Sequence, residues 1–192
     1  VPELKESTEA RALLDDPHTQ AALATLRAST HVDYDGVWTL KRRVLEILHR
    51  VFIVRHRDAR SGRGRDYRRY LEDEGATLVS FATFCALEDH FAIESRPRGW
   101  PQWPEEFRSP DSPDVVAFRS ANSDAVDFHR WLQFELDRQL AAAAAVARKA
   151  GLGIGIYQDL AIGAAPDSAD VWAFGHLFLR GVSVGAPPDG YA

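Results

Sequence analysis

Apolar residues recur along most of this chain at three- and four-residue steps, the spacing that gathers side chains on one face of an α-helix. The clearest early run predicts a helix over residues 37–55 and consists of Val37, Leu40, Val44, Leu48 and Val51. Before it, Asp16 and Pro17 predict a helix start, because aspartate caps a helix and proline suits its first position. The first part of the chain is therefore expected to be helical.

Two further helices are predicted over residues 65–74 and 76–91. They are divided at Gly75, because glycine weakens the interior of a helix. Residues 97–113 contain five prolines and two tryptophans, a composition that predicts irregular structure. The helical pattern is thus expected to stop there before a longer element begins.

A long helix is predicted over residues 123–150, with Asn122 as its candidate N-terminal cap. Its apolar face repeats at four-residue steps through Phe128, Leu132, Leu136 and Leu140. Gly151 suits the left-handed conformation that often ends a helix.

Residues 153–157 combine small and apolar side chains and predict a short strand of the parallel type, with Asp159 just beyond its C-terminal end. A helix that leads into a buried strand ending in a carboxylate is the repeating unit of a β/α barrel. Functional residues stand at that end of barrel strands. The fold class expected from the pattern is therefore mainly α with one short strand.

Composition narrows the classes of function. The chain has 192 residues, 23 basic against 28 acidic, and a net charge of −5, which argues against a nucleic-acid partner. Its longest apolar run, residues 140–147, is far shorter than the roughly 20 residues of a membrane span, so no membrane partner is expected. Cys85 is the single cysteine, which excludes an intramolecular disulfide. A cytoplasmic protein is expected.

Candidate chemistry outside the strand is sparse. The seven histidines form no His-Glu-x-x-His motif, so no metal site is predicted. The glycines at 151, 153 and 155 close a helix and open a strand, the reverse of a dinucleotide fingerprint, and no cofactor is expected. His129 and Cys85 lie on apolar helical faces and are interpreted as packed, unreactive residues. Residues 55–69 hold seven arginines, which suit either a solvated surface or an RNA patch; the net charge favours the solvated surface.

Three segments resemble a known family. Residues 151–163 read Gly-Leu-Gly-Ile-Gly-Ile-Tyr-Gln-Asp-Leu-Ala-Ile-Gly, residues 169–172 read Ala-Asp-Val-Trp, and residues 183–189 read Ser-Val-Gly-Ala-Pro-Pro-Asp. In this order and at this spacing they resemble the bacterial 4-alpha-glucanotransferases (amylomaltases or disproportionating enzymes), family 77 of the glycoside hydrolases. The matches are spread over roughly residues 30 to 189.

The resemblance implies a (β/α)8 barrel related to that of the α-amylases, decorated by helical insertions. It also implies a retaining transfer, in which an α-1,4-glucan is cut, a covalent glucosyl-enzyme forms, and the 4-hydroxyl of another maltodextrin receives the segment. Such chemistry uses two carboxyl groups about 5 Å apart. In this family the catalytic carboxylates all follow the Pro-Pro-Asp segment.

The chain is therefore expected to be an internal fragment of the barrel enzyme that is inactive by itself and contains no catalytic residue. Residues 1–121 are expected to form a helical insertion subdomain. Residues 122–192 are expected to supply a barrel helix, the third barrel strand and an acceptor-side loop. By position in the family, Asp159, Asp189 and Tyr191 are the predicted substrate-binding residues. The expected partners are a maltodextrin and the remainder of the enzyme chain.

Two alternatives belong to other classes. The chain could be a non-catalytic, helical maltodextrin-binding or scaffold protein derived from the enzyme, using Trp100, Trp103 and Tyr191 to stack on sugar rings. It could also be an RNA-binding helical module that uses the arginines of residues 55–69.

Overall fold

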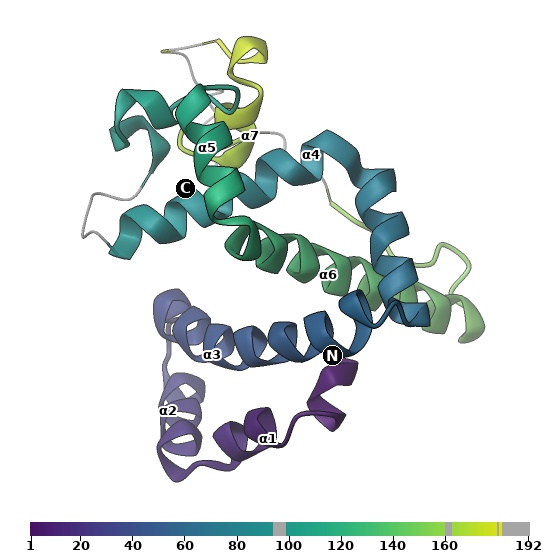
Figure 1. Cartoon of the computed structure of the whole chain (residues 1–192). Coiled ribbons are helices and arrows are strands. Elements are labelled where there is room, and N and C mark those ends of the chain that lie inside the picture. The colour runs from purple at the N-terminus through teal and green to yellow at the C-terminus, as the bar shows by residue number, and fades with distance from the viewer. Residues whose placement is uncertain (94–98, 160–162, 180, 182–192) are drawn as a thin grey trace, which may run out of the picture. The chain divides into compact units, whose positions relative to one another are not determined.

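The structure is a computed structural model that describes residues 1–93, 99–159, 163–179 and 181. It is mainly helical, as the sequence pattern predicts (Figure 1). The chain forms two compact units. The first contains Val1–Glu74 together with Trp131–Leu136, and the second contains Gly75–Arg130 together with Asp137–Ala192.

The first unit begins with a short 3-10 helix and three α-helices, which are η1 (Pro2–Lys5), α1 (Thr8–Asp15), α2 (Pro17–Ala28) and α3 (Tyr34–Phe52). The predicted cap is confirmed, since the Asp16 carboxylate accepts a hydrogen bond of 2.9 Å from the backbone amide of Thr19. Asp33 caps α3 in the same way, through the amide of Gly36. These caps fix where the helices start, and α1 packs against both α2 and α3.

The predicted helix over residues 37–55 is longer at its start and changes form at its end. After Phe52 the chain continues as a π-helix, η2 (Ile53–Asp58), and α4 (Gly62–Ile93) follows. The break predicted at Gly75 is confirmed, because this residue has φ +55° and ψ −135° inside α4. Glycine adopts this conformation without the steric cost that other residues meet.

The core of the first unit is aromatic. Phe52 of α3 and Tyr67 of α4 meet edge to face, with ring centroids 5.2 Å apart. Phe134 lies 5.2 Å from Tyr67, and Trp131 lies 6.1 Å from Phe52. Both come from the middle of α6 (Ser123–Lys149), so one turn of that helix completes the core.

The second unit contains the rest of α4 and α6, with α5 (Pro113–Ala121) and α7 (Ala169–Ala173). Residues 99–112 carry only two short 3-10 turns, Trp100–Gln102 and Glu105–Phe107, as their proline content predicts. A buried cluster joins these parts and consists of Phe84, Leu87, Phe91, Trp103, Val115 and Trp172. The indole nitrogen of Trp172 donates a hydrogen bond of 3.0 Å to the carbonyl of Phe107, which fixes α7 to the irregular segment.

Of the two caps predicted for α6, the one at its N-terminus is wrong and the one at its C-terminus is confirmed. Asn122 precedes the helix, but its side-chain amide donates to the carbonyl of Phe118 instead of accepting an α6 amide. Only one residue separates α5 from α6, so Asn122 satisfies the open carbonyl end of α5. At the other end the prediction is confirmed: Gly151 has φ +83°, and the amides of Gly151 and Leu152 bond to the carbonyls of Arg148 and Ala147.

The strand predicted over residues 153–157 is not formed, and the described residues of the chain contain no strand. Instead the segment is irregular and exposed, with Ile154 and Tyr157 open to solvent. A strand needs a neighbouring backbone that satisfies its amides and carbonyls, and no segment that the structure describes supplies one here. The apolar residues at these positions therefore do not form the predicted strand in this structure.

Candidate functional site

Of the three predicted substrate-binding residues, the structure places only Asp159. It follows the irregular segment, is exposed, and makes no hydrogen bond or ion pair with the residues that the structure describes. Asp189 and Tyr191 lie outside the described residues. The structure thus gives Asp159 no contact among the residues that it describes, and its substrate-binding role stays a prediction.

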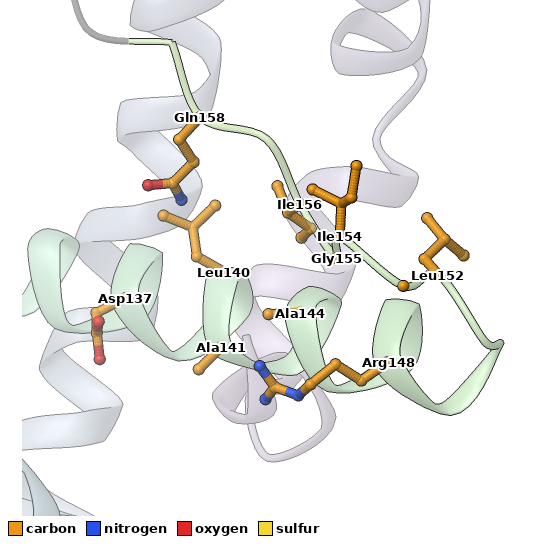
Figure 2. A pocket seen from close by; sticks show the side chains of 11 residues that line it. Asp137, Leu140, Ala141, Ala144, Arg148, Leu152, Ile154, Gly155, Ile156 and Gln158 are labelled. Atoms are coloured by element: carbon orange, nitrogen blue, oxygen red, sulfur yellow. The ribbon is translucent and has the colours of Figure 1, made fainter.

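A groove lies beside this segment in the second unit. The chain turns back after Gly151 and runs over the C-terminal half of α6, leaving a cavity of about 530 Å³ between them (Figure 2). Leu140 points from the helix toward the returning segment, while Ile156 and Gln158 line the cavity from above. Gln158 directly precedes Asp159 in the sequence, but Asp159 itself does not line the cavity.

The two tryptophans proposed for sugar stacking are packed inside the protein. Trp103 is only 1% exposed, and its ring lies 5.4 Å from Phe84 and 5.2 Å from Phe91. Trp100 is partly buried and packs against the same cluster. A face that already contacts protein cannot stack on a sugar ring, so the structure contradicts the use of Trp103 in the alternative binding function.

His129 is packed inside the protein and Cys85 is an unreactive thiol, as the sequence predicts. The Nε2 atom of His129, which is buried, donates to the Asp89 carboxylate at 2.7 Å. Burial raises the pKa of the Cys85 thiol to about 12, and the negative charges of Glu88 and Asp89 act in the same direction. A thiol with such a pKa is almost fully protonated at neutral pH and is a poor nucleophile.

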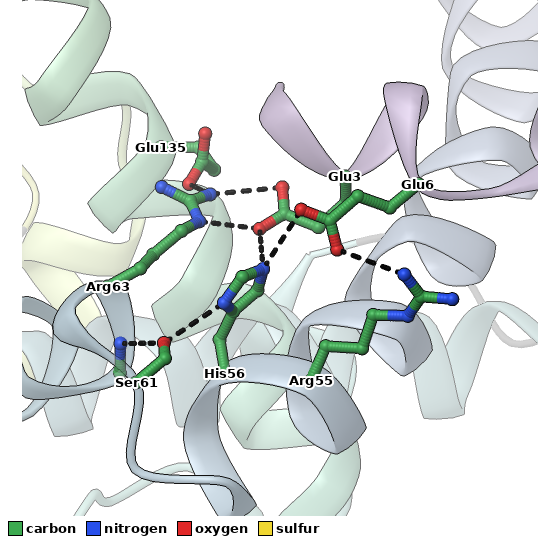
Figure 3. A network of polar contacts seen from close by, with 8 residues as sticks. Glu3, Glu6, Arg55, His56, Ser61, Arg63 and Glu135 are labelled. Atoms are coloured by element: carbon green, nitrogen blue, oxygen red, sulfur yellow. Dashed lines mark hydrogen bonds and ion pairs between the residues drawn. The ribbon is translucent and has the colours of Figure 1, made fainter.

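A buried ionic cluster in the first unit was not predicted. The Arg63 guanidinium donates to both oxygens of Glu3 and to Glu135, and it lies between the two carboxylates (Figure 3). Glu3 is 0% exposed and Glu135 is 4% exposed. The cluster joins η1 to the start of α4 and to the middle of α6, and we call these three residues the Arg63 cluster.

Further polar groups extend the Arg63 cluster toward the π-helix. His56 lies 3.4 Å from Glu6 and 3.8 Å from Glu3 through its Nε2 atom, while its Nδ1 atom is hydrogen-bonded to Ser61 at 3.0 Å. Arg55 is 3.7 Å from Glu6. These contacts hold the N-terminal 3-10 helix against η2.

Burial and charge oppose each other in the Arg63 cluster. Burial raises the pKa of Glu135, and the nearby Arg63 partly offsets this. For Arg63, burial alone would lower the pKa, but the hydrogen bond with Glu3 and the charges of both glutamates raise it above its usual value. The guanidinium therefore stays charged and balances two carboxylates that are withdrawn from water.

Two neighbouring carboxylates also define a retaining glycosidase site, yet Glu3 and Glu135 do not suit that chemistry. Their oxygens are committed to Arg63, and both side chains are almost fully buried. A nucleophile and an acid must reach the two sides of an exposed glycosidic bond. The Arg63 cluster therefore stabilises the fold.

The sequence interpretation missed this cluster because it grouped Arg63 with the solvated arginines. Two signals were present. Arg63 directly precedes Gly64, whose lack of a side chain allows close packing against the backbone of His56, and Glu135 follows Trp131 by four residues on the same helical face. Of the other arginines in this segment, four are exposed, as predicted, and Arg57 and Arg68 are partly buried; the exposed ones are Arg55, Arg60, Arg65 and Arg69.

Two further classes of site are absent from the described part of the chain. No group of three or more histidine, cysteine, aspartate or glutamate side chains is arranged to hold a metal ion there. In the same residues, no helix combines the length and the apolar character that crossing a bilayer requires.

Comparison with known proteins decides the family. A family model described as 4-alpha-glucanotransferase matches residues 4–192. The chain belongs to the 4-alpha-glucanotransferase family. The resemblance found in the sequence motifs is thereby confirmed.

Individual 4-alpha-glucanotransferases agree with this assignment. The chain is 42% identical to the 4-alpha-glucanotransferase of Mycobacterium tuberculosis over 158 residues, which are 82% of this chain and 20% of that protein. It is 31% identical to the 4-alpha-glucanotransferase of Haemophilus influenzae over 194 residues, covering 98% of this chain and 28% of the relative. The protein of the same name from Thermus thermophilus is 35% identical over 127 residues, 62% of this chain and 24% of its own length. The chain thus spans between 20% and 28% of the length of these 4-alpha-glucanotransferases.

Proposed function

We propose that this chain is part of an enzyme that transfers α-1,4-glucan segments between maltodextrins. The observation that carries the proposal is the family match over residues 4–192. In the proposed retaining double displacement, one carboxylate attacks the anomeric carbon while a carboxylic acid protonates the leaving oxygen. The conjugate base of that acid then takes the proton from the 4-hydroxyl of the acceptor, whose oxygen attacks the anomeric carbon and displaces the carboxylate, so that the free enzyme is restored.

The two catalytic carboxylates are proposed to lie outside this chain, in further sequence of the same enzyme. The share of the relatives that the chain covers supports this placement. Residues 1–121 are proposed to form a helical insertion. Residues 122–192 are proposed to supply a barrel helix, the third strand of a (β/α)8 barrel and an acceptor-side loop. Neighbouring strands would then give residues 153–157 the backbone partners that a strand requires.

Asp159, Asp189 and Tyr191 are proposed to bind the glucan. The carboxylates would accept hydrogen bonds from sugar hydroxyls, and the Tyr191 ring would stack on a glucose face. The exposed position of Asp159, without a partner among the described residues, supports its part of this proposal. It also makes the role testable, because a residue without structural contacts can be changed without harming the fold.

The direct test uses the open reading frame that contains this sequence, expressed from its source DNA. The purified protein is expected to convert maltotriose into glucose and longer maltodextrins, measured by chromatography of the products. Asp159→Asn is expected to lower this transfer while changing the free energy of unfolding by less than about 0.5 kcal/mol. Absence of transfer by the unaltered protein would contradict the proposed function.

The isolated 192-residue chain separates the enzyme from the binding alternative. It is expected to leave maltotriose unchanged, because it lacks the catalytic pair. Turnover that disappears in Asp159→Ala would overturn the placement of catalysis outside this chain. A calorimetric titration with maltoheptaose is expected to give no saturable heat at submillimolar sugar; tight binding without turnover would favour the non-catalytic alternative.

A further inference from the structure

We draw no further inference here: the strongest candidate, the surface patch of exposed aromatic side chains that Tyr34 and Trp38 form one turn apart at the start of α3 in the first unit, does not support a proposal, because nothing in the structure shows whether a ligand, a partner or further sequence of the same enzyme covers it.

Discussion

At the residue scale, Arg63 is the side chain on which most buried charge depends. Replacing it in Arg63→Met removes the cation that both Glu3 and Glu135 contact, and losing one partner of a buried ion pair typically costs about 3–5 kcal/mol. We expect a loss of about 3 kcal/mol in the free energy of unfolding at pH 7, measured by urea denaturation. The matched control is Arg50→Met, since Arg50 pairs with Glu9 at 3.1 Å on an exposed surface.

The control is expected to change stability by less than about 0.5 kcal/mol, because exposed ion pairs contribute little. Equal losses in the two variants would show that the Arg63 cluster is no more important than a surface pair.

The pH dependence of Arg63→Met follows from Glu135. Burial already raises the pKa of this carboxyl in the folded protein, and Arg63 is the group that holds it down. Without Arg63 the folded pKa rises further above the unfolded value, so the folded state binds the proton more tightly. The instability of the variant should therefore be largest above the folded pKa and should shrink as the pH falls below it. Urea midpoints of variant and unaltered chain that stay equally far apart from pH 8 to pH 5 would contradict this.

Gly64 offers a second test at the same scale. A Cβ atom here would overlap the carbonyl oxygen of His56 and lie 2.8 Å from its carbon, both of which are backbone atoms. Gly64→Ala is therefore expected to lower stability by about 2 kcal/mol, although alanine favours helices. At Gly62 a Cβ would meet only the flexible end of Arg65 at 3.6 Å. Gly62→Ala should therefore leave the stability unchanged, with both variants measured by thermal unfolding. A similar loss of stability in both variants would exclude the steric explanation.

At the element scale, the end of α6 depends on one glycine. Gly151 has φ +83°, a conformation that costs other residues about 1 kcal/mol or more. Gly151→Ala is expected to fray the last turn and to speed hydrogen exchange at the amides of Gly151 and Leu152, which bond to the helix carbonyls. Gly151→Asn should show a smaller effect, because asparagine tolerates this conformation better. Unchanged exchange in the alanine variant would contradict the assigned cap.

At the scale of the whole molecule, Cys85 reports on unfolding. Because burial raises the pKa of its thiol to about 12, alkylation by iodoacetamide at pH 8 should be slow in the folded chain and fast in urea. Cys85 lies in the second unit and Arg63 in the first, while α6 contributes residues to both. We expect Arg63→Met to accelerate the alkylation of Cys85, because loss of the first unit removes the packing of α6. An unchanged rate would show that the units unfold separately.

Much of this organisation was predictable from local sequence. The cap at Asp16, the break at Gly75 and the left-handed Gly151 each depend on one residue and its immediate neighbours, and all three are confirmed. The family was also recognisable, because its motifs are contiguous segments. Such features require no knowledge of which distant residues meet.

The features that could not be predicted depend on contacts between residues that are far apart in the sequence. Arg63 meets Glu3 and Glu135, which are 60 and 72 residues away, and no local pattern indicates those partners. The strand expected over residues 153–157 is absent from the described residues for a related reason. Its pattern indicates which side chains a strand would bury, but not whether another strand lies beside it. For the candidate site, the structure describes Asp159 but not Asp189 or Tyr191, and the substrate-binding role of all three stays a prediction.

The turn of α6 that contains Trp131 and Phe134 also determines which truncated forms of the chain can fold. Both rings belong to the core of the first unit, although the rest of that unit ends at Glu74. A plasmid truncated after codon 74 would encode a unit whose core lacks two aromatic rings, and its product should be degraded or insoluble. Co-expression with residues 75–192 would restore the missing turn in trans, so the two halves should be recovered together as a complex. No single cut in the gene can therefore separate the two units, because the first unit includes residues 131–136.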